Sequence, residues 1–463
     1  MESKEKSTKE NFYLDLRLRL LKFFNLIFVT ALFACVWFAY YGNQVYQGSF
    51  YFKGDIAVII LFAILYYTFG RIYDSFKVKY SKISELIYSQ ALALLFTDGI
   101  MFLVVCLLCR KIVNILPGFA MFGIQIVLCG FWCYVVHKWC TRVFAKSRTV
   151  IIYDQRKGLK NLIYEYGLDI KFDVKKTFAV KTIVEQLEKG NDKELKDIQT
   201  VFLTGVHSHE RNVIIKFCVE HNIKAFIIPR IGDLMMMSSR RMHMFHLPML
   251  LLERYKPDVE YTIIKRALDI LFSLIMIIVF SPFMIITAIA VKTDGGPVFY
   301  KQERLTRNGK IFKVLKFRSM RVDAEKDGKA VLSSGDKDPR ITKVGRIIRA
   351  IRFDELPQLF NILSGDMSIV GPRPERPQIH EKYCKELPEF NLRLQCKAGL
   401  TGYAQVYGKY NTTPYDKLLM DLMYISKPSI AQDLAIMFAT VKIIFMKDST
   451  EGIANSEIKM FEE

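Results

Sequence analysis

Residues that commonly bind transition metals are few in this sequence, and their spacing does not suit a metal site. The chain has nine cysteines and seven histidines in 463 residues. Cys106 and Cys109 form a CxxC pattern, but it lies inside an apolar run with no second pair of ligands, and the histidines lack zinc-type partners. We therefore expect neither a zinc site nor a dithiol redox site.

Motifs of nucleic-acid-binding proteins are absent as well. The formal net charge is +20, yet the sequence contains nothing resembling a recognition helix, a zinc finger or an RNA-binding sheet. A basic chain also suits an anionic membrane leaflet or phosphorylated substrates. These partners are favoured over nucleic acid.

The glycine fingerprint of a dinucleotide site is missing where it would be expected. Across residues 148–258, β-rich runs (TVIIYD, IQTVFLTG, IKAFIIPR) alternate with helical stretches such as NVIIKFCVEHN, which predicts a small Rossmann-like parallel sheet. The first strand continues as IIYDQRKG, without the glycines that let a pyrophosphate approach. We expect a degenerate domain with a structural or regulatory role. A nucleotide-sugar epimerase or dehydrogenase is disfavoured, because no suitable catalytic Tyr and Lys pair is found either.

Apolar residues are abundant, and they are concentrated in long runs. Hydrophobic residues make up 51% of the chain beside 24% charged residues. Runs over residues 20–41, 56–73, 91–108 and 115–137 approach the length that crosses a bilayer, so residues 1–147 are predicted to form a four-helix transmembrane domain. The first run lacks a signal-peptide cleavage site. Lysines and arginines crowd the second loop and the segment after the fourth run, which places both ends of this domain in the cytoplasm.

A fifth apolar run, uncharged over residues 270–291, is interrupted in its middle by Ser281 and Pro282. Proline removes a backbone donor and breaks or kinks a helix. A spanning helix would carry the downstream residues outside, whereas a re-entrant helix hairpin over residues 265–292 keeps them on the cytoplasmic face. The re-entrant form is preferred, although kinked spanning helices are common.

Two adjacent carboxylates, Asp354 and Glu355, precede a short apolar helix predicted from DELPQLFNILSG, with Gly365 as its stop. Asp354 is expected at or near the N-cap, where the positive end of the helix favours an ionised carboxylate that can attack phosphorus. The alternative is that Asp354 only caps the helix. From this segment alone the two explanations are equally good.

Arginines surround the acidic pair in the sequence. Arg346, Arg349 and Arg352 recur every three residues, with Ile347, Ile348 and Ile351 on the other side, which predicts a helix that presents guanidinium groups to phosphates at a membrane surface. Arg373 stands between two prolines, a rigid setting suited to clamping a phosphate or pyrophosphate. A solvated basic face is the alternative for the helix, and the nearby carboxylates make it less attractive.

Several ordered motifs carry a family resemblance. They are KRALDI, the helix broken at Ser281 and Pro282, GPVFYKQER, KFRSM, DPRITKVGRIIR, DELPQLFNILSGDMSIVGPRP and AGLTGYAQVYG, and they cover nearly all of residues 265–445. On these motifs the chain resembles the bacterial polyprenyl-phosphate phosphoglycosyl transferases of the monotopic superfamily, in the long form that starts capsule, exopolysaccharide or O-antigen units. The front half resembles the long members by pattern.

The resemblance implies a membrane protein of α plus α/β class, with a mostly helical monotopic catalytic domain over residues 259–463. It implies that Asp354 attacks the β-phosphate of a UDP-sugar, releasing UMP, and that undecaprenyl phosphate then takes the sugar phosphate. By the same carry-over, Glu355 helps to hold Mg2+. Phosphate contacts are implied for Lys316, Arg318 and Arg349, and a nucleotide contact for Arg373. The inner membrane, with the site on its cytoplasmic face among membrane lipids, and a homodimer are also implied.

Some questions stay open at this level. Leu305, Thr306 and Phe353 depart from the family pattern, and these departures are expected to affect substrate fit and not the chemistry. A membrane-anchored regulator or scaffold of polysaccharide assembly, in which the acidic pair is only a cap, is the competing function. Glucose or galactose is the expected sugar, from the resemblance alone.

Overall fold

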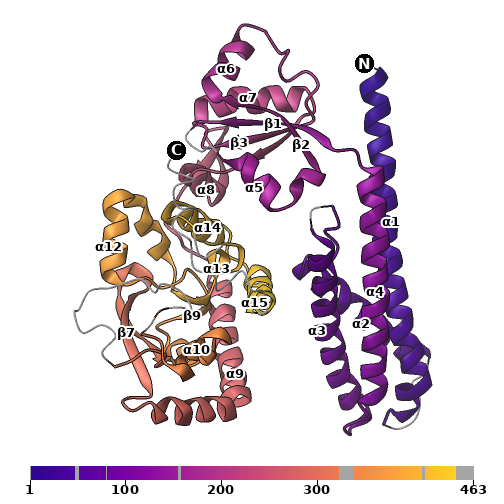
Figure 1. Ribbon diagram of the computed structural model, residues 1–463, viewed down its shortest axis with the longest axis vertical. Coiled ribbons are helices and arrows are strands. Elements are labelled where there is room, and N and C mark those ends of the chain that lie inside the picture. Colours follow the sequence, from indigo (N-terminus) through magenta and orange to yellow (C-terminus); the bar gives the residue numbers. More distant parts are fainter. Residues whose placement is uncertain are drawn as a thin grey trace. The chain divides into compact units, whose positions relative to one another are not determined.

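The computed structural model describes residues 2–46, 52–79, 81–154, 158–322, 338, 340–408 and 412–444. The chain divides into two compact units, Met1–Ile228 and Pro229–Glu463. The first unit contains four long helices and a small parallel sheet (Figure 1). The second unit contains the acidic pair and the arginine-rich motifs.

The four long helices of the first unit are α1 (Glu2–Val36), α2 (Phe52–Ile72), α3 (Ile83–Cys109) and α4 (Leu116–Val143). They pack as a bundle, because α1 and α3 each contact both α2 and α4. All four are long and apolar enough to cross a membrane, and α9 (Val259–Thr293) of the second unit is a fifth such helix among the described residues. The protein is therefore membrane-embedded, and every predicted apolar run is helical. Inside the bundle the Tyr66 hydroxyl donates to Asn25 Oδ1 at 2.8 Å, a polar contact between α2 and α1.

The small sheet of the first unit is fully parallel, as predicted. Its strands β1 (Ser147–Tyr153), β2 (Phe172–Ala179), β3 (Thr200–Thr204) and β4 (Lys224–Ile227) lie in the order β2-β1-β3-β4. Helices α5 (Leu159–Glu165), α6 (Val180–Glu188) and α7 (Ser208–Glu220) connect the strands. Ile152 and Val201 from adjacent strands, with Ile183 of α6 and Ile214 of α7, form its buried core. This alternation of apolar strands and amphipathic helices is what the sequence pattern predicted.

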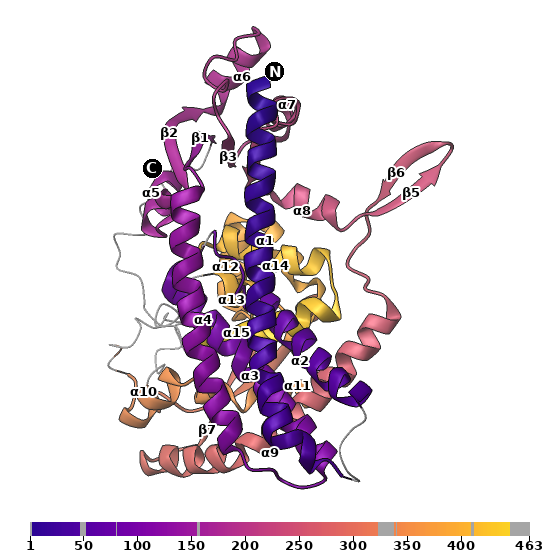
Figure 2. The same ribbon diagram turned by 90° about the vertical axis from the view of Figure 1, so that its right-hand side faces the viewer.

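The second unit begins with α8 (Ile231–Met237) and an antiparallel hairpin, β5 (Arg240–Met244) and β6 (Leu247–Leu251). The hairpin extends away from the helices of its own unit (Figure 2). A second antiparallel hairpin, β7 (Phe299–Leu305) and β8 (Ile311–Phe317), turns through Asn308 and Gly309 as predicted. Both turn residues have positive φ, which asparagine and glycine tolerate best.

Helix α9 is continuous over Val259–Thr293, with Pro282 inside it, and both views show it bent (Figures 1 and 2). Pro282 has no N–H to donate to the Ile278 carbonyl, and the Ser281 hydroxyl donates to that oxygen instead, at 2.8 Å. The Ser-Pro pair thus produces a bend whose freed carbonyl is satisfied. That the bent helix re-enters the leaflet stays a prediction.

Short elements build the rest of the second unit around α9. Met284 and Val291, in the second half of α9, are buried against Phe317 of β8 and Ile348 of α10. The remaining elements are α10 (Lys343–Ala350), α11 (Gln358–Ser364), β9 (Ser368–Val370), α12 (Pro377–Glu386), β10 (Gly399–Thr401), α13 (Tyr403–Tyr407), α14 (Pro414–Ser426) and α15 (Ile430–Ile444), with a 3-10 helix over Pro388–Gln395.

Candidate functional site

Asp354 lies in a tight 3-10 turn, Phe353–Glu355, between α10 and α11. Asp354 is near the N-cap of the apolar helix but is not the cap itself, because α11 starts at Gln358 and its N-cap is Pro357. Arg352 has a left-handed backbone, with φ of 60°, which ends α10 and turns the chain before it can enter α11 directly. The geometry therefore comes from the turn and not from the end of a long helix. Gly365, with φ of 92°, ends α11 as predicted.

The predicted arrangement of α10 is only partly correct. Ile348 is buried against α9, but Ile347 and Ile351 are exposed, so the three isoleucines do not share one face. Arg352 lies beyond the last residue of α10. Of the three isoleucines, only Ile348 packs against α9, while the side chains of Ile347 and Ile351 are exposed.

Phe353, the residue that departs from the family pattern, fixes the acidic turn to the bend of α9. Its ring lies 6.0 Å from that of Phe280 and 6.1 Å from that of Phe283, both edge to face. These two phenylalanines flank Ser281 and Pro282 in the sequence. Edge-to-face aromatic pairs add to burial in stabilising such a contact. The ring of Phe353 therefore packs the acidic turn directly against the segment of α9 that contains Ser281 and Pro282.

Glu355 is held by two cations that come from distant parts of the chain. Its Oε1 lies 2.7 Å from Lys316 Nζ and 3.0 Å from Arg373 Nη2. Burial on its own raises the pKa of Glu355, but Lys316, Arg373 and Arg352 outweigh burial and hold that pKa well below its usual range. Lys316 is on β8 and Arg373 is in the GPRP segment after β9, so the structure brings together three of the predicted site residues.

Asp354 is 9% exposed, and its pKa is shifted in the opposite direction to that of Glu355. Burial and the adjacent Glu355 charge raise its pKa, while Lys316, Arg349 and Arg352 act in the opposite direction. Arg349, predicted to contact phosphates, is thus close enough to influence Asp354. A buried carboxylate among cations has the composition of a site that handles a phosphorylated group.

The hydrogen bond of Arg318 goes to α9 and not to the acidic pair. Its Nη2 donates to the Val291 carbonyl at 3.1 Å, at the carboxyl end of α9. Its Nε and Nη1 are buried and have no hydrogen-bond partner among the described residues. Gly296, with φ of 86°, leaves it room, since a Cβ there would lie 2.2 Å from Nη1. A phosphate contact by Arg318 therefore stays a prediction.

A buried ionic cluster behind Arg373 escaped the sequence-based prediction. Arg393 is 2% exposed, and its Nη2 donates to the Arg373 carbonyl at 2.9 Å. Its Nε donates to Asp421 Oδ2 at 2.8 Å, and its Nη1 lies 3.5 Å from Glu375 Oε1. Lys417 pairs with Glu375 too. Burial alone raises the pKa of Glu375, but Lys417 and Arg393 bring it down to about 2. Because these residues are far apart in the sequence, no spacing signal could have identified the cluster.

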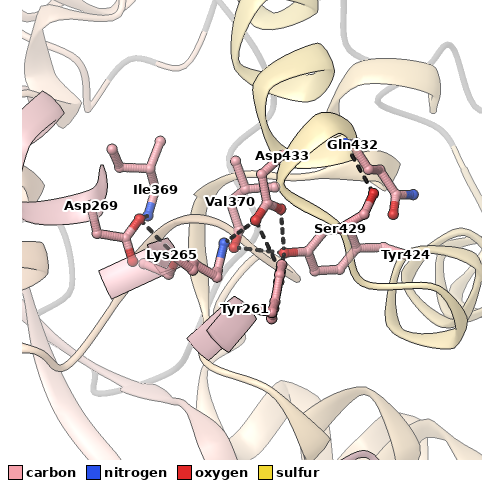
Figure 3. Close-up of polar contacts among 10 residues, drawn as sticks. Tyr261, Lys265, Asp269, Ile369, Val370, Tyr424, Ser429, Gln432 and Asp433 are labelled. Carbon is pink, nitrogen blue, oxygen red and sulfur yellow. Dashed lines mark hydrogen bonds and ion pairs between the residues drawn. The ribbon is translucent and has the colours of Figure 1, made fainter. Parts of the chain in front are cut away.

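The KRALDI motif anchors α9 to the site. Arg266 donates to the Ile362 carbonyl at 2.6 Å and to the Leu363 carbonyl at 2.8 Å, so it caps the carboxyl end of α11. Asp269 accepts from the Ile369 amide at 3.0 Å. Lys265 pairs with Asp433 of α15 (Figure 3). The motif was visible in the sequence, but its structural role depends on these distant partners.

Close backbone contact shapes the GPRP segment that carries Arg373. The short parallel strands β9 and β10 pair Ser368 with Gly399. A Cβ at Gly399 would lie 2.1 Å from the Gly371 amide nitrogen, and one at Gly402 would lie 2.1 Å from the Gly371 carbonyl oxygen. Glycine is therefore required at these positions for the backbone to approach this closely.

The carboxylates of the acidic turn are the candidate ligands for Mg2+, which the resemblance implies. Among the described residues no group of three or more His, Cys, Asp and Glu side chains could hold a metal. Mg2+ is, however, often bound by one or two carboxylates completed by substrate phosphates and water. Asp354 and Glu355 supply that number of carboxylates, so the residues fit a metal that binds together with its substrate.

Comparison with known proteins places this site in context. A family model described as bacterial sugar transferase matches residues 260–447. The chain is 36% identical over 231 residues to a UDP-N-acetylgalactosamine-undecaprenyl-phosphate N-acetylgalactosaminephosphotransferase of Aeromonas hydrophila, covering 49% of this chain and 53% of that protein. It is 40% identical over 199 residues to an undecaprenyl-phosphate galactose phosphotransferase of Salmonella typhimurium, covering 40% of this chain and 41% of the relative.

A shorter relative is covered more fully. A UDP-glucose:undecaprenyl-phosphate glucose-1-phosphate transferase of Caulobacter vibrioides is 38% identical over 199 residues, which is 42% of this chain and 74% of that protein. The chain spans about half the length of the longer relatives cited, or somewhat less. The matched region contains the acidic turn and its cations.

Proposed function

Because the chain belongs to the bacterial sugar transferase family, we propose that it transfers a sugar 1-phosphate from a UDP-sugar to undecaprenyl phosphate. The products would be UMP and an undecaprenyl-diphosphate sugar, the first membrane-bound intermediate in the assembly of a capsule, exopolysaccharide or O-antigen. The names of the matched relatives support both the donor and the acceptor.

One observation carries this proposal: a buried carboxylate, Asp354, lies next to Glu355, which pairs with Lys316 and Arg373. Phosphoryl transfer needs a placed nucleophile and cations that stabilise the shifting negative charge. A helix cap would not require cations from β8 and from the GPRP segment. The arrangement therefore favours chemistry over a purely structural acidic pair.

The first half-reaction is attack by an Asp354 oxygen on the β-phosphorus of the UDP-sugar. The bond between that phosphorus and the bridging oxygen breaks, UMP leaves with the bond's electron pair, and the sugar phosphate stays on Asp354 as an acyl phosphate. Lys316 and Arg373 orient the diphosphate and balance its charge. The raised pKa of Asp354 makes its ionisation sensitive to these cations.

The second half-reaction returns Asp354 to its starting form. A phosphate oxygen of undecaprenyl phosphate attacks the same phosphorus, the bond to Asp354 breaks, and the carboxylate leaves. Mg2+ held by Glu355, with Asp354 beside it, would neutralise diphosphate charge when bound. No histidine base is needed, because both nucleophiles are already anionic near neutral pH.

The acidic turn stays on the cytoplasmic side only if α9 does not span the membrane, and the bend at Ser281 and Pro282 allows this. We propose that α9 enters and leaves the same leaflet, in the inner membrane, so that a soluble UDP-sugar and a lipid phosphate meet at one surface. An accessibility tag placed after Val291 should be labelled only from the cytoplasmic side. Labelling from the periplasmic side would show that α9 spans.

The activity is tested with the purified full chain, undecaprenyl phosphate, Mg2+ and a panel of UDP-glucose, UDP-galactose and UDP-N-acetylgalactosamine. UMP release with at least one donor is expected. Asp354→Asn should reduce it by about 10³-fold or more, whereas Asp294→Asn, at an exposed position after α9, should not.

A second measurement addresses the covalent intermediate directly. Without acceptor, a donor labelled in its sugar should leave label on the wild-type protein and none on Asp354→Asn. UMP release that persists in Asp354→Asn would contradict the nucleophile. Absence of UMP with every donor would contradict the function.

A further inference from the structure

Three polar side chains in the middle of the membrane bundle have no hydrogen-bond partner among the described residues. The atoms are Thr30 Oγ1 of α1, both carboxylate oxygens of Asp98 of α3, and the amide oxygen and nitrogen of Gln125 of α4. All of these atoms are buried, and Gln125 is 0% exposed. We call Thr30, Asp98 and Gln125 the midplane polar set. Buried polar atoms are normally paired, so this set requires an explanation.

Each residue of the midplane polar set lies near the middle of its own apolar run. The runs that contain the three residues cover residues 20–41, 91–108 and 115–137. A run of this length crosses the hydrocarbon core of a bilayer, so its middle lies near the centre of the membrane. The position in the sequence alone therefore places the three residues at a similar depth.

The structure brings Asp98 and Gln125 to the same level. Helices α3 and α4 pack against each other and are joined by residues 110–115. Asp98 lies 11 residues before the end of α3 at Cys109, and Gln125 lies 9 residues after the start of α4 at Leu116. Because a helix rises about 1.5 Å per residue, both residues lie roughly 15 Å from this connection.

A contact between α1 and α4 adds Thr30 to this level. Asn25 Nδ2 of α1 lies 3.8 Å from Cys129 Sγ of α4. The two helices run antiparallel in an up-and-down bundle, so a step forward along α1 corresponds to a step back along α4. Thr30 lies 5 residues after Asn25, and Gln125 lies 4 residues before Cys129. Thr30 and Gln125 are therefore both about one helical turn beyond the contact.

The neighbouring polar residues of the bundle are already paired with one another. The Tyr66 hydroxyl donates to Asn25 Oδ1 at 2.8 Å and also contacts Gln90 Oε1. Gln90 Nε2 donates to the Ser75 carbonyl at 3.2 Å. These side chains form a hydrogen-bonded network of their own, whereas the midplane polar set, one turn further along, is left without partners in the described part of the chain.

Asp98 adds a negative charge to this level, and the sequence places no positive charge beside it. An ionised carboxylate without a partner is costly in the bilayer core, so a proton or a bound cation must neutralise Asp98. The basic residues nearest to this level along the four helices all lie close to where an apolar run begins or ends; they are Lys22, Lys53, Arg71, Arg110 and Lys138.

We propose that the midplane polar set binds one Na+ ion through an Asp98 carboxylate oxygen, Gln125 Oε1 and Thr30 Oγ1. Hard cations prefer carboxylate, carbonyl and hydroxyl oxygens, which are the groups that this set supplies. A single positive charge balances the one carboxylate, whereas a divalent ion would leave an unpaired charge in the membrane. The ion would hold α1, α3 and α4 together. The site does not depend on the reaction proposed above, because all three residues belong to the first unit.

The test is the thermal unfolding midpoint of the full chain in detergent, with NaCl replacing choline chloride at constant ionic strength. All three tryptophans lie in or directly after a bundle helix, so their fluorescence reports on the bundle. The midpoint should rise by about 5 °C when Na+ reaches roughly 100 times its dissociation constant. Asp98→Asn keeps the size of the side chain and should abolish this rise. The matched control, Asp74→Asn, lies in the loop between α2 and α3 at a positive φ that asparagine tolerates, and it should keep the rise.

Binding of radiolabelled Na+ to the wild type gives the dissociation constant directly. Gln125→Leu should raise it about 10-fold or more. If Asp98→Asn does not fold, Gln125→Leu is decisive, and an unchanged dissociation constant would overturn the proposal. An equal midpoint of the wild type in NaCl and in choline chloride would overturn it in favour of a proton on Asp98. Equal stabilisation by MgCl2 would also overturn it, because the charge balance at Asp98 requires a monovalent ion.

Discussion

The ion pair between Lys265 and Asp433 makes a quantitative prediction about how α9 is attached to its unit. Asp433 is 5% exposed. Its Oδ2 lies 2.9 Å from Lys265 Nζ and accepts from the Tyr261 hydroxyl at 2.9 Å, and its Oδ1 accepts from the Tyr424 hydroxyl at 2.8 Å (Figure 3). Three donors therefore converge on one buried carboxylate. The first two come from α9, the helix that carries the bend.

Removing either partner should have unequal effects. Asp433→Leu leaves the Lys265 charge buried without its partner, and we expect a loss of about 3–5 kcal/mol in the free energy of unfolding. Lys265→Met leaves Asp433 with two tyrosine donors, so the expected loss is about 3 kcal/mol or less. The double variant removes both charges, and apolar replacement of a buried pair is often close to neutral. With a nearly neutral double variant, these losses correspond to a coupling energy of about 3 kcal/mol or more.

Tryptophan fluorescence does not report on the unfolding of this unit, because the three tryptophans, Trp37, Trp132 and Trp139, all lie in the other unit. Pulse proteolysis of the full chain in urea measures the stability instead. The exposed pair Lys385 and Glu381 on α12 is the control, and its removal should cost no more than about 0.5 kcal/mol. If the losses of the two single variants simply add in the double variant, the pair is not coupled and the proposed anchoring of α9 is wrong.

Three further predictions concern the acidic turn. Ionised Asp354 is required for attack, and its pKa is raised, so kcat/KM should fall as the pH drops through a value above the ordinary Asp pKa of about 3.9. Glu355→Gln removes a negative neighbour of Asp354, so the fall in kcat/KM should move to lower pH. Lys316→Gln removes a cation, so the fall should move to higher pH. Shifts in the same direction would contradict the electrostatic model. A lysine at position 393 cannot make the contacts of Arg393 to Asp421 and to the Arg373 carbonyl at the same time. For Arg393→Lys we therefore expect kcat, measured by UMP release, to fall about 10-fold or more, with the acid limb of the pH profile unchanged. An unchanged kcat would show that the cluster does not position Arg373.

Local chemistry explains why much of this protein was predictable. Apolar runs of bilayer length gave helices, and alternating β-rich and helical stretches gave the parallel sheet, because both depend on periodicity within a short window. The turn at Asn308 and Gly309 and the helix stop at Gly365 follow from residues that tolerate positive φ. Pro282 predicted a break, and α9 is bent.

The errors arose where the backbone conformation of one residue controls the chain direction. Arg352 has a left-handed conformation that arginine rarely adopts, so α10 ends before Arg352, which the pattern had included in that helix. Asp354 then lies in the turn, and the N-cap of α11 is Pro357. The isoleucines of α10 were assigned to one face because the pattern does not show which side α9 covers.

The sequence motifs, together with the family resemblance they carry, predicted that Asp354, Glu355, Lys316 and Arg373 belong to one site, and Glu355 does contact both Lys316 and Arg373. Their arrangement required the fold, because Glu355 reaches Lys316 across 39 residues and Arg373 across 18. The bracing of Arg373 by Arg393, and the anchoring of α9 through Lys265, depend on contacts with no periodic signature. Sequence pattern reports local preference, whereas the balance of buried charges is settled only when distant segments pack together.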